Sequence, residues 1–207
     1  MRTQPSHKPL QKGSAATLAD HLRAGRVYRR EDLTRLSSAV DRDLGKLVAT
    51  GRLNKLAQGL YYAPKASRFG PLPPDDAQVV QSFLRGDADF LLFSPSAYNT
   101  VGLGTTQLYN RTLVYNRKRH GIFRLGKREF DFRVKPRFPR QLTPEFLFVD
   151  LLNNLDDLAE DRDSVLERAR VLWPSRVSPK LLQAVELYGN AATRKHIKEW
   201  MDDLVPA

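Results

Sequence analysis

The sequence predicts an α+β fold: an N-terminal part of short helices and a strand pair, then a mixed α/β domain with a small antiparallel sheet and a helical tail. Three observations predict it. Apolar residues recur at helical spacing from Val40 to Val48, they alternate with polar residues from Glu129 to Lys135, and helical patterns return after Thr143. Strand-rich and helical stretches that are separate along the chain are typical of α+β proteins.

Length and composition limit the class of protein. The chain has 207 residues, of which 41% are hydrophobic, enough for one large domain or two small ones. No apolar run reaches the ~18 residues that a membrane helix needs, and the polar N-terminus does not resemble a secretory signal. The sequence has no cysteine, which excludes disulfides, thiolate zinc sites and cysteine nucleophiles. We expect a cytoplasmic protein that does not bind membranes.

The positive charge is concentrated in two blocks. The net charge is +11. Residues 1–65 contain 13 Lys and Arg against 5 Asp and Glu, and residues 108–140 contain 11 against 2. Residues 66–107 and 141–207 are net acidic. Two concentrated blocks favour two surfaces for polyanions over a uniformly basic coat.

The first element of regular structure follows a polar stretch, residues 1–13, which lacks periodicity and contains proline and glycine. We expect this stretch to be a flexible basic tail. A helix then begins near Ser14, with Leu18 and Leu22 on one face. Gly25 is the expected stop, because glycine favours the end of a helix.

Two further helices are separated by a turn at residues 36–38. The first carries Glu31 and Asp32 in its first turn, where negative charge is favourable at the positive end of the helix dipole. The second is expected to be capped by Ser37 or Ser38. Its apolar residues recur at i, i+4, i+7 and i+8, the stripe of an amphipathic helix: Val40, Leu44, Leu47 and Val48.

A short strand pair is predicted at residues 52–56 and 60–63, with Gly59 in the turn. Tyr61 or Tyr62 is expected in the core. Helix, turn, helix and strand pair in this order are typical of a winged helix-turn-helix, which usually places one helix in the major groove of DNA. We therefore expect residues 14–65 to bind double-stranded DNA.

The candidate DNA contacts lie mainly on the polar face of the second of these two helices and near the tip of the strand pair. Arg42 is the candidate for a guanine contact, because its guanidinium matches O6 and N7. Serine and lysine side chains suit phosphate contacts better. The alternative is an ordinary solvated helix face. The predicted set is Arg30, Ser37, Ser38, Asp41, Arg42, Lys46, Lys55 and Gln58.

A domain boundary is predicted in the proline-rich residues 66–74, which we expect to be a semi-rigid linker. The C-terminal domain would span residues 75–207. It is expected to open with a helix at 75–84 and a strand at 90–93, followed by a helix that Ser94 caps. The pair of glycines at 102 and 104 does not favour a nucleotide site, because it lacks a third glycine and follows a helix.

Three strands are predicted next, at residues 112–115, 121–125 and 129–135, with basic connections. These connections form a possible second polyanion surface for DNA, RNA or an acidic partner. A solvated basic hairpin is the alternative. The basic residues are Arg117, Lys118, Arg119, Arg124, Lys127 and Arg128. Helices are then predicted from Thr143, near 164–173, at 178–188 and at 191–204.

No catalytic site, metal site or cofactor is predicted. The four histidines are far apart in the sequence, and none has the spacing of a metal-binding helix. Glu129, Asp131 and Lys135 partly match the acidic residues and lysine of metal-dependent nucleases, but Arg133 takes the usual place of the lysine. A nuclease guided by a winged helix stays an alternative. A second alternative is a protein-interaction module without DNA binding, which would use the acidic residues 156–163.

Two stretches together resemble one protein family. Residues 26–65, from RVYRREDL to GRLNKLAQGLYYAPK, and residues 90–116, FLLFSPSAYNTVGLGTTQLYNRTLVYN, resemble AbiEi-type antitoxins of type IV toxin–antitoxin and abortive-infection systems, as does the later LTPEFLFVDLLNNL. The resemblance covers most of residues 14–160. Its most specific parts are the turn at Gly59-Leu60-Tyr61 and residues 94–115.

The resemblance implies a non-enzymatic protein of phage defence. Such antitoxins repress their own operon by binding inverted repeats in its promoter, which makes them autoregulated transcriptional repressors. Their C-terminal domain is needed to counter the cognate toxin, a nucleotidyltransferase-like enzyme encoded next to them. Antitoxicity in this family does not require a stable complex with that toxin. No cofactor is implied.

Overall fold

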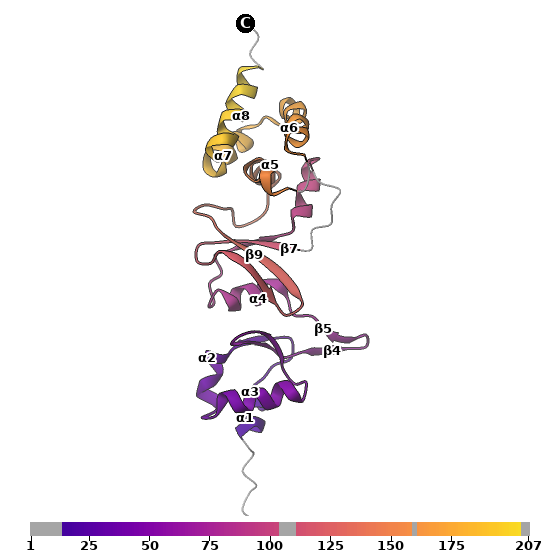
Figure 1. Cartoon of the computed structure of the whole chain (residues 1–207), viewed down its shortest axis with the longest axis vertical. Helices are drawn as coiled ribbons and strands as arrows, with labels where there is room; N and C mark the ends of the chain where they lie inside the picture. The colour runs from indigo at the N-terminus through magenta and orange to yellow at the C-terminus, as the bar shows by residue number, and fades with distance from the viewer. Residues whose placement is uncertain (1–13, 104–110, 159–160, 204–207) are drawn as a thin grey trace, which may run out of the picture. The chain divides into compact units, whose positions relative to one another are not determined.

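The computed structural model describes residues 14–103, 111–158 and 161–203. The fold is α+β, as predicted, and the chain divides into two compact units (Figure 1). The first unit comprises residues 1–87 with 124–127, and the second comprises residues 88–123 with 128–207. The predicted tail, residues 1–13, lies outside the described residues. No helix among the described residues is long and apolar enough to cross a membrane.

The first unit begins with helices and a short strand. They are α1 (Ser14–Asp20), β1 (Val27–Arg29), α2 (Arg30–Leu33), the 3-10 helix η1 (Thr34–Leu36) and α3 (Val40–Ala49). The core forms where their apolar faces meet, and the side chains of Leu18, Leu33 and Leu44 are at most 2% exposed. The predicted stripe of α3 is confirmed, because Val40, Leu44 and Leu47 are all buried.

A three-stranded antiparallel sheet completes this part, with strand order β1-β3-β2. Its later strands are β2 (Asn54–Ala57) and β3 (Leu60–Tyr62). Gly59 has φ +70°, the left-handed conformation that glycine adopts without strain, so the tight turn between them needs it. Every side chain of β3 is buried, which confirms that tyrosines at 61 and 62 belong to the core.

The predicted linker has regular structure. Residues 65–72 form a hairpin of β4 (Lys65–Ser67) and β5 (Gly70–Leu72). The next helix, α4 (Asp76–Phe83), packs against β1, and the main-chain N–H of Val27 donates to Oε1 of Gln78. The two units therefore divide between residues 87 and 88, later in the chain than the predicted boundary, because α4 belongs to the first unit.

The second unit contains a sheet and a set of helices. Its sheet strands are β6 (Leu91–Phe93), β7 (Arg111–Asn116), β8 (Gly121–Leu125) and β9 (Arg128–Val134), although residues 124–127 group with the first unit. Its helices are η2 (Pro95–Val101), α5 (Pro144–Asn153), η3 (Leu155–Asp157), α6 (Arg162–Arg176), α7 (Pro179–Tyr188) and α8 (Ala191–Asp202). The segment after Ser94 is thus a 3-10 helix, which that serine caps as predicted.

The sheet is mixed, so the predicted antiparallel sheet was wrong for one pair of strands. Its order is β6-β7-β9-β8. β6 pairs antiparallel with β7, but β7 pairs parallel with β9, in register from Arg111 opposite Glu129 to Asn116 opposite Val134. The predicted alternation in β9 holds for Phe130 and Phe132, which are buried between more exposed neighbours, but it was wrong for Val134, which is 48% exposed.

The helical core of the second unit is built around α5. Seven consecutive residues of α5, Phe146 to Leu152, are buried. The helix lies against η2, α7 and α8 (Figure 1). Both tryptophans of the chain pack in this core: Trp173 is 1% and Trp200 is 5% exposed, and their ring centroids are 5.9 Å apart. Their fluorescence therefore reports on the second unit alone.

Candidate nucleic-acid interface

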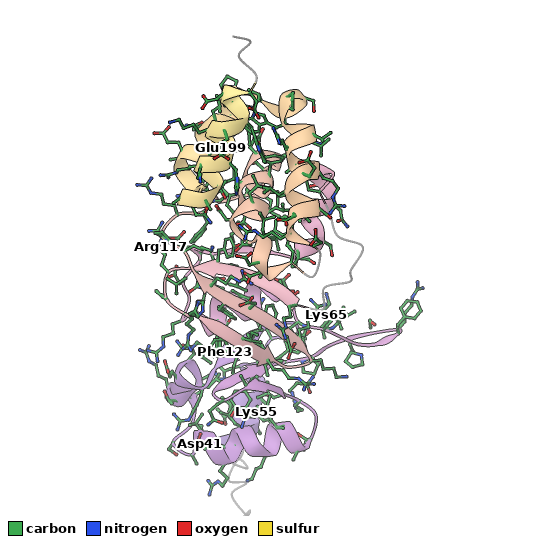
Figure 2. The ribbon with its side chains drawn as sticks, turned by 45° about the horizontal axis from the view of Figure 1, so that its top comes forward. Asp41, Lys55, Lys65, Arg117, Phe123 and Glu199 are labelled. Atoms are coloured by element: carbon green, nitrogen blue, oxygen red, sulfur yellow. The ribbon has the colours of Figure 1, made fainter. Side chains whose placement is uncertain are left out.

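One face of α3 is polar and open to solvent. Asp41, Arg42, Gly45 and Lys46 are exposed on it, and Ser38 is exposed just before the helix (Figure 2 labels Asp41). The side chains of Arg42 and Lys46 have no hydrogen-bond or ion-pair partner among the described residues. Two cations without protein partners on one helix face are available to phosphates and to base edges.

Arg30 connects this face to the turn between β2 and β3. Its guanidinium donates two hydrogen bonds to the carboxylate of Asp41, each 2.6 Å long. These bonds hold the pKa of Asp41 below its ordinary value. The main-chain N–H of Arg30 donates to the carbonyl oxygen of Gly59 at 2.9 Å. One residue therefore contacts both the start of α3 and the turn of the strand pair.

The strand pair presents two more of the predicted residues. Lys55 and Gln58 are exposed, and Nζ of Lys55 donates to Oε1 of Gln58 at 3.1 Å. A hydrogen bond between exposed side chains exchanges readily with water, so the ammonium can turn toward another acceptor at little cost. The structure thus brings Arg30, Asp41 and this turn together.

Ser37 does not suit the predicted phosphate contact. Its side chain is only 8% exposed, and its hydroxyl donates to Oδ2 of Asp43 at 2.6 Å while accepting from the N–H of Ala39. Asp43 is only 1% exposed. Its burial was not predicted, because an aspartate in an amphipathic helix is expected to be exposed to solvent. Ser37 instead bonds to the residue before α3 and to Asp43 within it. The predicted serine cap was wrong, because the N-cap position is Ala39 and has no side-chain cap.

We predict that Ser37→Ala destabilises the first unit by about 1–3 kcal/mol, since the buried Asp43 carboxylate loses a hydrogen-bond donor. Hydrogen exchange of the α3 amides measures this loss, because the tryptophans do not report on this unit. The control is Ser38→Ala, an exposed neighbour that should change stability by no more than about 0.5 kcal/mol. Equal protection in both variants would contradict the assigned role of Ser37.

The predicted second basic surface is divided between two turns. Arg117, Lys118 and Arg119 lie between β7 and β8, whereas Lys127 and Arg128 lie at the start of β9. β8 separates these positions by about 16 Å at ~3.3 Å per residue. Arg124 is exposed near the end of β8. Arg124 and Lys127 group with the first unit, whereas the other four residues belong to the second.

The first of these turns is held by Asn116, which is not one of the predicted site residues. Its side chain is 1% exposed and accepts the main-chain N–H groups of Lys118 and Arg119 at 2.8 and 2.7 Å. Arg117 is partly engaged, because its Nε lies 3.3 Å from the carboxylate of Asp89. An asparagine directly before a basic turn is a signal that could have found this arrangement.

The polar face of β9 carries ion pairs. Arg133 is 2.8 Å from Asp131 and also bonds to Asn154 and Asp157, while Glu129 lies 3.5 Å from Arg111. Lys135 lies over the ring of Tyr115. Within residues 14–103, 111–158 and 161–203, no three His, Asp or Glu side chains are grouped to hold a metal. These contacts give no specific support to the nuclease alternative.

A buried carboxylate connects three elements of the second unit: α5, η2 and β7. Asp150 is 2% exposed and accepts hydrogen bonds from the hydroxyls of Tyr98 at 2.8 Å and Tyr115 at 2.9 Å. Burial raises the pKa of Asp150 above its ordinary value, and these hydrogen bonds oppose the shift. Asp150 and Tyr115 line one side of a cavity of about 500 Å³, which Lys135 also lines.

No family model, curated protein or solved structure matches this chain.

Proposed function

We propose that the first unit is a winged helix-turn-helix that binds double-stranded DNA. α3 acts as the recognition helix, and the turn between β2 and β3 acts as the wing. Arg42 contacts a guanine in the major groove, and Ser38, Lys46 and Lys55 contact phosphates. Ser37 is no longer part of this proposed contact surface.

One observation carries this proposal: the position of Arg30. Its side chain binds Asp41 on the exposed face of α3, and its main chain binds Gly59 in the turn. A recognition helix and a wing must keep a fixed spacing if both are to contact one duplex. Pairing with Asp41 also offsets the negative charge that would otherwise repel phosphates from this face.

We further propose that the whole chain is an antitoxin of a type IV toxin–antitoxin system, which represses its own operon and counters a nucleotidyltransferase-like toxin without catalysing a reaction. The resemblance to AbiEi-type antitoxins supports this proposal. Its promoter target would contain inverted repeats, and its second unit would supply the antitoxin activity, with or without a stable complex with the toxin.

The DNA proposal predicts different results for two variants. Arg42→Ala should weaken binding to a promoter fragment about 5- to 150-fold and relax its sequence preference, because one bidentate base contact is lost. Lys55→Ala should weaken binding to all sequences and lower the salt slope by about one, because one phosphate contact is lost. Fluorescence anisotropy across a range of salt concentrations measures both effects.

Lys180→Ala is the matched control, since it removes an exposed lysine from α7 in the second unit. It should bind like the wild type. Unchanged affinity and salt slope in both Arg42→Ala and Lys55→Ala would reject the proposed DNA face. The antitoxin proposal is checked separately by expressing the chain with the enzyme encoded next to it. Restored growth supports the proposal, and continued toxicity contradicts it.

A further inference from the structure

The hairpin of β4 and β5 exposes a large aromatic ring. Phe69, in the two-residue turn, is 85% exposed, the highest value among the large hydrophobic side chains described as exposed in this structure. A single exposed hydrophobic residue is common, and this ring would gain free energy if a partner buried it. Figure 2 shows this hairpin extending from Lys65 at its base.

The hairpin is ordered at both ends. At the tip, the hydroxyl of Ser67 donates to the carbonyl of Gly70 at 2.7 Å and accepts the N–H of Phe69 at 3.2 Å. At the base, the hydroxyl of Tyr62, a core residue, donates to the carbonyl of Leu72 at 2.9 Å. The ring of Phe69 therefore lies at the end of a strand pair that hydrogen bonds stabilise and connect to the core of the first unit.

The positive charge near the Phe69 ring indicates which kind of partner it would bind. The guanidinium of Arg68 lies 4.6 Å from the centroid of the Phe69 ring, and Lys65 is exposed on β4. Residues 44–74 contain five Lys and Arg but no Asp or Glu, and this stretch includes both the β2–β3 turn and the hairpin. Cations beside an aromatic ring, with no carboxylate nearby in the sequence, suit a polymer of phosphates and stacked planar bases.

We propose that the β4–β5 hairpin is a second DNA-binding element, in which Lys65 and Arg68 bind phosphates and Phe69 inserts its ring at a base step in the minor groove. Apolar side chains that enter the minor groove partly unstack a base step and kink the duplex. This inference rests on the proposed DNA-binding function. It adds a contact outside the recognition helix and the wing.

The test uses the full-length chain and the promoter fragment in fluorescence anisotropy. Phe69→Ser should weaken binding about tenfold, because a ring–base contact is lost, and should leave the salt slope unchanged. Arg68→Ala should lower the salt slope by about one. Val171→Ser is the matched control, since Val171 is 70% exposed on α6 in the second unit. It should bind like the wild type.

A second readout reports the insertion itself. With 2-aminopurine placed at successive steps of the fragment, the wild type should raise the fluorescence at one step, and Phe69→Ser should abolish the rise. If the wild type binds and Phe69→Ser matches it in both readouts, the hairpin proposal is wrong while the DNA-binding proposal stands. If the wild type binds no promoter DNA, both proposals fail. If Phe69→Ser only dissociates a DNA-free dimer in sedimentation, the ring is a self-association contact and the hairpin proposal is also wrong.

Discussion

Replacing Asp150 with alanine should destabilise the second unit by about 3 kcal/mol. The hydroxyls of Tyr98 and Tyr115 both donate to this carboxylate, and their side chains are 2% and 1% exposed. Alanine leaves both of these buried hydroxyls without this acceptor. Urea unfolding followed by tryptophan fluorescence measures the loss in the second unit, because both tryptophans lie there.

The variant Asp150→Asn separates the charge of this side chain from its shape. Burial raises the pKa of Asp150 in the folded state, so above the ordinary value of 3.8 the folded protein holds a proton that the unfolded chain has released. The stability contributed by Asp150 must therefore fall as pH rises through this window. The unfolding free energy of the wild type minus that of Asp150→Asn should decrease as pH rises above about 4. A difference that increases with pH would contradict the raised pKa.

Replacing Gly189 with alanine should destabilise the second unit by about 2–3 kcal/mol. Gly189 is buried where α7 ends, and its N–H donates to the carbonyl of Val185. An added Cβ would lie 2.5 Å from that carbonyl oxygen, a contact that real structures do not tolerate. The backbone between α7 and α8 must then move, which weakens the bond that ends α7. The same tryptophan-detected unfolding measures this effect.

Gly45→Ala is the control for the Gly189 substitution. A Cβ at Gly45 meets no atom within 4 Å, and this glycine lies within a helix, where alanine is favoured by about 1 kcal/mol. This variant should leave the tryptophan transition unchanged, because α3 belongs to the first unit. A Gly189→Ala protein that unfolds like the wild type would show that the end of α7 accommodates the methyl group freely.

Local patterns predicted the local structure well. The spacing of Val40, Leu44 and Leu47 predicted the buried face of α3, because a helix repeats every 3.6 residues regardless of what it packs against. The alternation around Phe130 and Phe132 predicted the face of β9 for the same kind of reason. The exposed residues Arg42 and Lys46 followed from the same stripe, as its polar complement.

Contacts between distant residues were not predictable in this way. Asp150 pairs with tyrosines 35 and 52 residues earlier in the chain, and within the sequence of α5 it appears only as one polar residue in an apolar run. Ser37 was expected to contact phosphate because serine is usually exposed before a helix. In the structure it is buried together with Asp43, to which its hydroxyl donates. The prolines at 71, 73 and 74 suggested a linker, but Tyr62 anchors that segment as a hairpin.

The strand order of the mixed sheet has a consequence for how the protein folds. β8 and β9 are neighbours joined by the two residues 126–127, so their hairpin can form from local contacts alone. β7 has no such local partner, because β9 lies between it and β8, and its antiparallel partner β6 lies 20 or more residues earlier in the chain. The parallel pairing of β7 with β9 requires the β8–β9 hairpin to form first and then to dock on β7, which closes a loop between them. We expect that docking to be the late, slow event in folding, after the first unit has formed its more local helices.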